Sequence, residues 1–282
     1  MAITVNTNVT SLQAQLNLNN SQMSLSQSLQ RLSSGLRVNS AKDDAAGLAI
    51  SQTLTSAIRG NNQAIKNAND GTSVGQTAEG ALGQIANNLQ RIREIAVQSS
   101  NSSVSNTNRS QLQNEVDQLT QEISRIVQTT QFNGTQLLSG SAILTFQVGS
   151  SGASSNQVSI SSVDLTSGGV LCSYNSSLTA TGTINITTQS GASALLSTLD
   201  SDIAEISTVR STWGAVQNRF DAVVANLQSY VQNLTAANSR IVDVDFAAET
   251  ANLTKNQILQ QAGASILKQA NTIPQAALTL LQ

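Results

Sequence analysis

Histidine is absent from the 282 residues of the chain, and proline, cysteine and tryptophan occur once each. Without an imidazole the chain cannot build a Ser-His-Asp or Cys-His catalytic group, a zincin motif or a histidine proton shuttle. We therefore expect a protein that is not an enzyme, and the sequence offers no catalytic residue, cofactor-binding motif or metal-ligand cluster. A single cysteine also excludes an internal disulfide.

Charged residues are scarce as well: they make up 11% of the chain, where about 25% is usual, and the net charge is −2. Such a surface has no basic patch for a phosphate backbone or for acidic lipids, so nucleic acid is not an expected partner. No run approaches the ~20 apolar residues of a membrane span, and residues 1–6 lack the basic and apolar regions of a secretory signal. If the protein leaves the cell, we expect it to use another route.

Apolar residues repeat with helical spacing over most of the chain. In the C-terminal half they recur every seven positions, at Leu199, Ile206, Trp213, Phe220, Leu227, Leu234 and Ile241. Stripes with steps of three and four residues run over 50–96 and 112–126. Helices with such narrow seams bury them by packing side by side. With aromatic residues at only 2%, a long thin bundle with aliphatic seams fits better than a thick globular core.

Residues 41–98 are predicted to form one helix. Ser40 and Asp43 resemble a capping box at its start. Five glycines inside this range weaken the expectation that the helix is unbroken, because glycine is a poor helix former: Gly60, Gly71, Gly75, Gly80 and Gly83. Between 126 and 199 the only charged residue is Asp164, and alternating apolar residues over 144–148 and 158–160 predict a β-hairpin with loops.

Both ends of the chain carry apolar stripes that lack a charged opposite face. There is no charged residue in 1–30, and Lys268 is the only one in 256–282. The predicted seam consists of Val9, Leu12, Leu16, Leu29 and Leu32 near one end and Leu259, Ile266, Ile273 and Leu280 near the other. Such helices are marginal alone. Either the two ends pair within one subunit, or their packing is completed only when many subunits stack together.

The run from Leu29 to Gly47, LQRLSSGLRVNSAKDDAAG, resembles a signature of bacterial flagellin. So does the run from Leu89 to Ser99, LQRIREIAVQS, and the segments 239–249 and 269–275 are similar to the C-terminal part of that family. The resemblance covers roughly 1–140 and 191–282. The middle, 141–190, does not match and is short for the family.

The resemblance implies a mainly α fold: a long antiparallel, coiled-coil-like helical bundle whose N- and C-terminal helices pair, with a small outer region of β-hairpin and loops. It also implies three parts with different places in a filament. Residues 1–40 and 248–282 would form the inner core, 41–140 and 191–247 a helical shell with a β-hairpin, and 141–190 a variable outer segment. We expect a subunit that polymerises with copies of itself into the flagellar filament used for swimming.

The family resemblance further implies the partners. Flagellins leave the cell through the flagellar type III export channel and are extracellular; they meet an export chaperone at the C-terminal helix, the filament cap and the hook-filament junction proteins. The animal Toll-like receptor for flagellin recognises the monomer. The residues that match its contact surface, shared with axial subunit contacts, are Gln90, Arg91, Glu94, Ile95 and Glu115. At 100° per residue Ile95 is expected to be an exposed apolar residue on this polar face.

Three alternatives differ in what they require. A hook-filament junction protein is similar to flagellin at its ends, but the sustained matches at 31–47 and 90–99 favour flagellin. A coiled-coil adhesin or phage fibre usually has charged residues beside its seam and a trimerising head, neither of which is evident. An enzyme carried in 141–190 would have to work with one Asp, one Tyr and one Cys, which supply no general acid-base pair.

Overall fold

A computed structural model describes residues 7–279 except 141, 167–170, 172 and 175–183. The helices are α1 (Val9–Ser34), α2 (Ala45–Ser99), α3 (Asn106–Thr129), α4 (Gln189–Val242) and α5 (Phe246–Thr279). The strands are β1 (Gln131–Phe132), β2 (Thr135–Gln136), β3 (Ile143–Gln147) and β4 (Gln157–Ser161), and a 3-10 turn, η1 (Ser154–Asn156), precedes β4. The predicted mainly α fold is confirmed.

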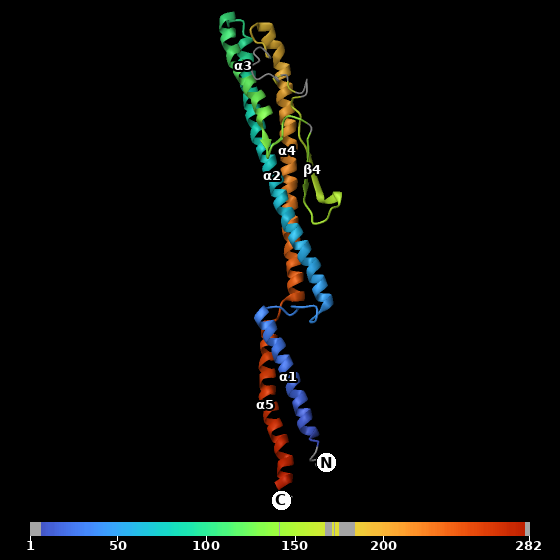
Figure 1. Ribbon diagram of the computed structural model, residues 1–282. Coiled ribbons are helices and arrows are strands. Elements are labelled where there is room, and N and C mark those ends of the chain that lie inside the picture. Colours follow the sequence, from blue (N-terminus) through green and yellow to red (C-terminus); the bar gives the residue numbers. More distant parts are fainter. Residues whose placement is uncertain (1–6, 141, 167–170, 172, 175–183, 280–282) are drawn as a thin grey trace. The chain divides into compact units, whose positions relative to one another are not determined.

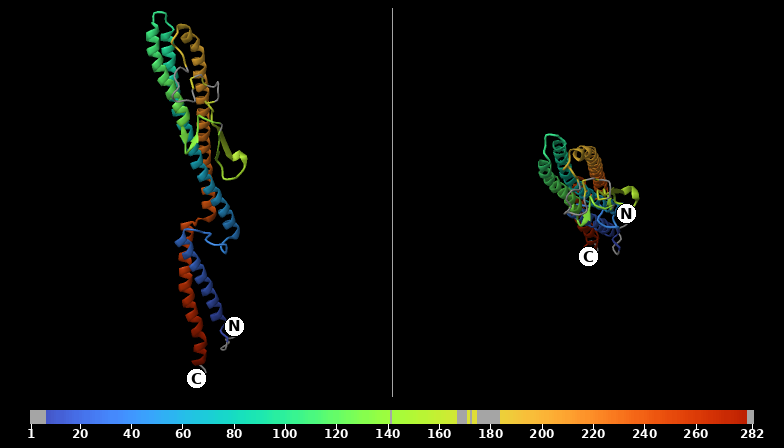
Figure 2. Two further views of the ribbon diagram at one scale, coloured as in Figure 1. Left: turned by 45° about the horizontal axis from the view of Figure 1, so that its top comes forward. Right: turned by 90° about the horizontal axis from the view of Figure 1, so that it is seen from above.

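The chain forms two compact units. The terminal unit comprises Met1–Ile58 and Gln232–Gln282, and the central unit comprises Arg59–Val231. In the central unit the segments of α2, α3 and α4 lie alongside one another, with the hairpin β3–β4 beside α4 (Figures 1 and 2). The described residues of 141–190 thus belong to the central unit.

The predicted seams form the core of the central unit. On α4 the seven-residue ladder is buried from Leu199 to Leu227. On α2 the buried apolar residues include Leu82, Ile85, Leu89 and Ile92, each with no exposed surface. Fully burying a side chain of this size is worth about 1.5–3 kcal/mol, so these facing ladders hold the three helices together.

The helix α2 is continuous through all five glycines that weakened the expectation of an unbroken helix. Three of the glycines are needed for close packing. A Cβ on Gly71 would lie 2.5 Å from the ring of Phe220, one on Gly75 would lie 2.8 Å from Gln217, and one on Gly60 would lie 2.8 Å from Ser150. The loss of helix propensity at these positions is therefore offset by tighter contact with α4 and with the hairpin loop.

The hairpin β3–β4 is anchored to the central helices and does not stand apart from them. Its strands pair antiparallel with Phe146 opposite Val158. The ring of Phe146 meets Phe220 of α4 edge to face at 5.4 Å between centroids, and Asn67 of α2 donates to the Gln147 carbonyl at 2.9 Å. The predicted hairpin is confirmed, but it contributes to the core.

A second anchor lies between α3 and the start of α4. The side-chain amide of Gln113 donates to the Ile184 carbonyl at 2.6 Å and accepts from the Ile186 N–H at 2.8 Å. The hydroxyl of Ser99 donates to the Ile186 carbonyl at 2.7 Å. These buried side chains act on residues 184–186 as a neighbouring strand would, so the chain that leads into α4 is held against α3.

The start of α2 differs from the prediction. The Asp43 carboxylate does reach back to Ser40, accepting from its N–H and its hydroxyl, both at 2.9 Å. Residues 40–43 form a turn, however, and the helix begins at Ala45 with Asp44 as its cap, whose carboxylate accepts from the Gly47 N–H at 2.8 Å. Asp43 and Asp44 are both acceptable helix N-cap residues, and Asp44 is the one that caps α2.

Candidate assembly and recognition surfaces

The helices α1 and α5 pair antiparallel in the terminal unit, as predicted (Figure 1). Near the start of α1, Asn8 donates to the Ala270 carbonyl at 2.8 Å and Ser11 donates to the Asn271 side chain at 2.7 Å. At the other end Arg31 lies 3.7 Å from Glu249. Polar contacts at both ends therefore set the register of this terminal pair.

The side chains that face inward in the terminal pair are mostly small or polar. They follow coiled-coil steps of three and four residues and are buried or half-buried. We call them the inner stripe: Ser11, Ala14, Leu18, Ser21, Leu25, Ser28 and Leu32 on α1, and Glu249, Leu253, Asn256, Gln260, Gly263, Leu267 and Ala270 on α5. Five of these fourteen residues are leucines, and the others are small or polar, so only part of the contact between α1 and α5 is hydrophobic.

Larger apolar side chains of the same helices point away from this contact. Their exposed fractions lie between 44% and 65%, and we call them the outer stripe: Val9, Leu12, Leu16, Met23, Leu259 and Ile266. On α1 the four members fall within an arc of about 60°, roughly opposite the inner stripe. An open groove of about 660 Å³ lies on this side of α1, lined by residues from Leu16 to Ser26 that include Met23. The terminal pair thus has large apolar side chains on its outward side as well as on its inward side.

The remaining residues of the predicted filament-core seam differ in exposure. Leu29 is also exposed, whereas Leu32 is half-buried on the inner stripe, so this member of the predicted filament-core seam faces the other helix of its own subunit. Ile273 belongs to α5, and Leu280 lies outside the described residues. Ile50 was included in the predicted stripe of 50–96 but is exposed, and the search for periodic ladders missed exposed Phe246 and Ile258.

Arg91 is the centre of an ion-pair cluster on the surface of the central unit. It donates to Glu115 of α3 at 2.8 Å and to Glu94 at 3.0 Å. The hydrogen bond to Glu115, followed by the one to Glu94, raises the pKa of Arg91 above its ordinary value. Gln90 is exposed beside it. We call Gln90, Arg91, Glu94 and Glu115 the Arg91 surface; it brings together four of the five residues expected from the sequence.

The fifth residue, Ile95, contradicts the expectation of an exposed apolar side chain, because its exposed fraction is 1%. The reason is that α2 packs against two helices and not one. Ala81, Gln84 and Asn88 face α3 across a small groove, and Ile95 is seven residues beyond Asn88 on the same side of the helix. Ile95 is therefore a core residue beneath the Arg91 surface.

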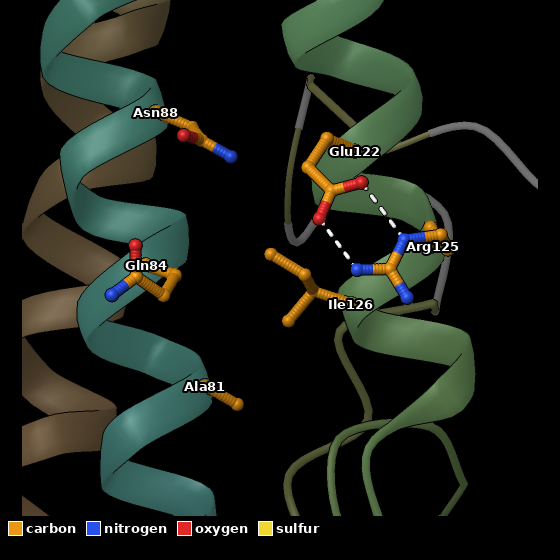
Figure 3. A pocket seen from close by; sticks show the side chains of 6 residues that line it. All are labelled: Ala81, Gln84, Asn88, Glu122, Arg125 and Ile126. Atoms are coloured by element: carbon orange, nitrogen blue, oxygen red, sulfur yellow. Dashed lines mark hydrogen bonds and ion pairs between the residues drawn. The ribbon is translucent and has the colours of Figure 1, made fainter.

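The groove between α2 and α3 is shown in Figure 3. It has a volume of about 210 Å³, and its wall on α3 is formed by Glu122, Arg125 and Ile126. Arg125 donates to both carboxylate oxygens of Glu122, at 2.8 and 2.6 Å, and this contact lowers the pKa of Glu122. The two charged residues that line the groove are thus paired with each other within α3.

The described residues form neither a metal site nor a membrane-spanning helix. Within the part of the chain that the structure describes, no three carboxylate or thiol side chains come together as metal ligands. Among the same residues, no helix has the length and hydropathy needed to cross a membrane.

Comparison with known proteins decides the family. Residues 5–142 match the bacterial flagellin N-terminal helical region and residues 196–281 match the bacterial flagellin C-terminal helical region. The chain belongs to the flagellin family. The unmatched interval of this flagellin agrees with the resemblance drawn from the sequence, which left 141–190 uncovered.

Known relatives extend the match over nearly the whole chain. The flagellin of Halalkalibacterium halodurans is 42% identical over 268 residues, covering 95% of this chain and 94% of that protein. Flagellin B of Vibrio cholerae is 35% identical over 375 aligned positions, covering both chains completely. A solved structure of a putative flagellar hook-associated protein from Vibrio parahaemolyticus has a TM-score of 0.55, covers 72% of this chain and 99% of its own, and is 14% identical, so it is similar in fold alone.

Proposed function

We propose that this flagellin is a non-enzymatic structural subunit that polymerises with copies of itself into the extracellular flagellar filament used for motility. The observation that carries the proposal is the outward position of the outer stripe on a helix pair with almost no charge. In an isolated subunit these side chains face water, and stacked copies would bury them without bringing like charges together. Family membership supports the same conclusion.

The three parts of the chain would then have different places. Residues 1–40 and 248–282 would form the inner core, 41–140 and 191–247 the shell, and 141–190 the outward segment. Deletion of 1–38 or of 250–282 is expected to abolish polymerisation and to leave the central unit folded, because the core of that unit contains none of the deleted residues. Electron microscopy of negatively stained protein and circular dichroism test the two parts of this expectation. Filaments formed by either truncated chain would contradict it.

The remaining partners belong to the same proposal. An export chaperone would bind the exposed apolar residues of α5 before assembly, and the filament cap and hook-filament junction proteins would meet the same terminal pair. The alternative role of a junction protein is less well supported, because the relatives similar over the whole chain are flagellins and the hook-associated likeness is one of fold. Abundance in sheared filaments separates the two roles: a junction protein is a minor component.

We further propose that the Arg91 surface is a contact for the next subunit and for the animal Toll-like receptor for flagellin. What supports it is that Arg91, Glu94 and Glu115 are exposed and mutually oriented, with Ile95 as a rigid base below. Arg91→Ala is expected to weaken receptor binding by about 30-fold, as for a central arginine in an interface. Arg93→Ala, which breaks the exposed pair with Asp200, is the matched control. Equal binding by wild type and Arg91→Ala monomers would refute the assignment.

A further inference from the structure

Asn133 and Gly134 are the only asparagine–glycine pair in the sequence, and they form the turn between β1 and β2. Their φ angles are 46° and 81°. A two-residue hairpin loop with positive φ at both positions has the twist that the flanking strands require, and asparagine followed by glycine adopts it most readily. The turn explains why these two residues are present, and it also brings a reactive pair to the surface.

The turn is open and only lightly held. Asn133 and Gly134 are both exposed. Within the described part of the chain the side-chain amide of Asn133 has no hydrogen-bond partner, and a Cβ on Gly134 would have no heavy atom within 4 Å. Only two residue pairs join β1 to β2. A two-stranded hairpin this short is marginally stable by itself, so the backbone of the turn can change conformation at low cost.

An exposed asparagine before glycine can lose its side-chain amide without an enzyme. The backbone nitrogen of Gly134, after losing its proton to base, attacks the side-chain carbonyl carbon of Asn133. A bond forms between these two atoms, the bond to the side-chain nitrogen breaks, and this nitrogen leaves as ammonia. Water then opens the resulting succinimide ring at one of its two carbonyl groups, giving aspartate or, when the main-chain carbonyl is attacked, isoaspartate. Glycine allows this approach because it has no Cβ beside the attacking nitrogen.

The chain contains one other pair of similar chemistry, and its surroundings differ. Asp70 precedes Gly71, and an exposed aspartate before glycine could form the same succinimide with loss of water. Both residues lie in the interior of α2, however, where the backbone N–H groups are engaged in the helix. Gly71 is also buried, against the ring of Phe220. Its nitrogen is therefore not free to attack, and the open turn at Asn133 is the reactive position.

We propose that Asn133 is a site of spontaneous deamidation, with water as the co-reactant, and that isoaspartate formed there loosens the packing of the segment that follows. Isoaspartate adds a carbon atom to the main chain, so the two-residue turn no longer fits between the paired strands. β2 leads directly to Leu137 and Leu138, which have no exposed surface, and the Leu137 N–H donates to the Thr130 carbonyl at 3.1 Å. A change at the exposed turn thus reaches the core of the central unit.

The test is incubation of the full-length monomer in mildly alkaline buffer, followed by peptide mass spectrometry and by enzymatic methylation, which detects isoaspartate. Asn133 should lose its amide before any other asparagine, with no isomerisation at Asp70. The melting temperature of the incubated protein should fall by about 2–4 °C, the shift expected from loss of about one backbone hydrogen bond in a unit of this size. Asn133→Gly is the matched control: it removes the side-chain amide, and glycine retains the positive φ of the turn. Its melting temperature should not change on incubation.

Three outcomes would contradict the proposal. An Asn133 amide that is retained, or lost no faster than those of other asparagines, would overturn the assignment of the site. Isomerisation of Asp70 at the same rate would also overturn it, since the sequence pair and not the open turn would then decide reactivity. Deamidation at Asn133 with no greater fall in melting temperature than in Asn133→Gly would overturn the link to the core. None of these results depends on whether the protein polymerises.

Discussion

The outer stripe gives a quantitative prediction for assembly. Leu12 and Leu16 have exposed fractions of 57% and 53% in the subunit. Complete burial of a leucine is worth about 1.5–3 kcal/mol, so covering the remaining half of each side chain contributes about 1 kcal/mol. The double variant Leu12→Ala, Leu16→Ala should therefore lose about 2 kcal/mol of association free energy per subunit, equivalent to a rise of about 30-fold in critical concentration.

The assay is sedimentation of filaments grown from monomer over a range of concentrations. Monomer helicity should be unchanged, because both side chains are exposed before assembly and alanine is a good helix former. Ile143→Ala is the matched control: Ile143 is even more exposed, at 68%, but lies on β3, outside the terminal pair. A critical concentration equal to that of wild type in the double variant would refute the reasoning that the outer stripe is covered by neighbouring subunits.

Three further predictions concern the subunit itself. Gln113→Ala should lower the free energy of unfolding by about 1–3 kcal/mol, since it leaves the Ile184 carbonyl and the Ile186 N–H without their partner; chemical denaturation measures this, with exposed Gln111→Ala as control. Gly71→Ala should destabilise by about 1–3 kcal/mol, because the added methyl meets the Phe220 ring, and an unchanged melting temperature would contradict that packing. Hydrogen bonds from Ser40 lower the pKa of Asp43 below its ordinary 3.8. They therefore stabilise the 40–43 turn above pH 3.8, and this stabilisation is lost as the pH falls through the lowered pKa of the folded protein. In Ser40→Ala, NMR titration should show a higher pKa for Asp43.

The long helices of the central unit could be predicted because each repeats its buried positions for many turns. The ladder from Leu199 to Leu227 arises because other helices contact α4 along most of its length. The presence of the helix, its length and its buried side could therefore all be predicted from one pattern. The hairpin was predictable for the same reason, since alternation over 144–148 reflects one covered face. Neither pattern indicates which element packs against the buried face, and so the contact between Phe146 and Phe220 was not predicted.

Ile95 was placed wrongly because a single stripe was taken as the whole buried side of α2. A helix between two neighbours buries two adjacent stripes, and a residue 100° from one of them can lie on the other. The polar residues Gln84 and Asn88 on the α3 side concealed the second stripe, since their spacing carries no hydrophobic signal. Leu32 of the predicted seam faces α5 within the subunit, which the sequence left open: in a helix with apolar residues on two sides, periodicity does not say which side meets the partner helix.

The placement of hydrophobic groups separates what folds the subunit from what assembles it. In the central unit the large side chains of the core, such as Leu82 of α2 and Phe220 of α4, are buried within the subunit. That unit therefore needs no neighbour to bury them. In the terminal pair five leucines face inward among small and polar residues such as Ser11, Ser28 and Asn256, and the six large apolar side chains of the outer stripe face outward. If the inner stripe were strongly apolar, α1 and α5 would be stable as an isolated pair and burial against other copies would add little to what the monomer already has. An inner stripe that is partly polar fixes register through hydrogen bonds at Asn8 and Ser11 and leaves the hydrophobic free energy of the outer stripe to be released on stacking. For this reason Ser28→Leu should make the terminal pair of the monomer more helical and leave the critical concentration for polymerisation no lower than that of wild type. A lower critical concentration would show that pairing within the subunit, and not contact between subunits, limits assembly.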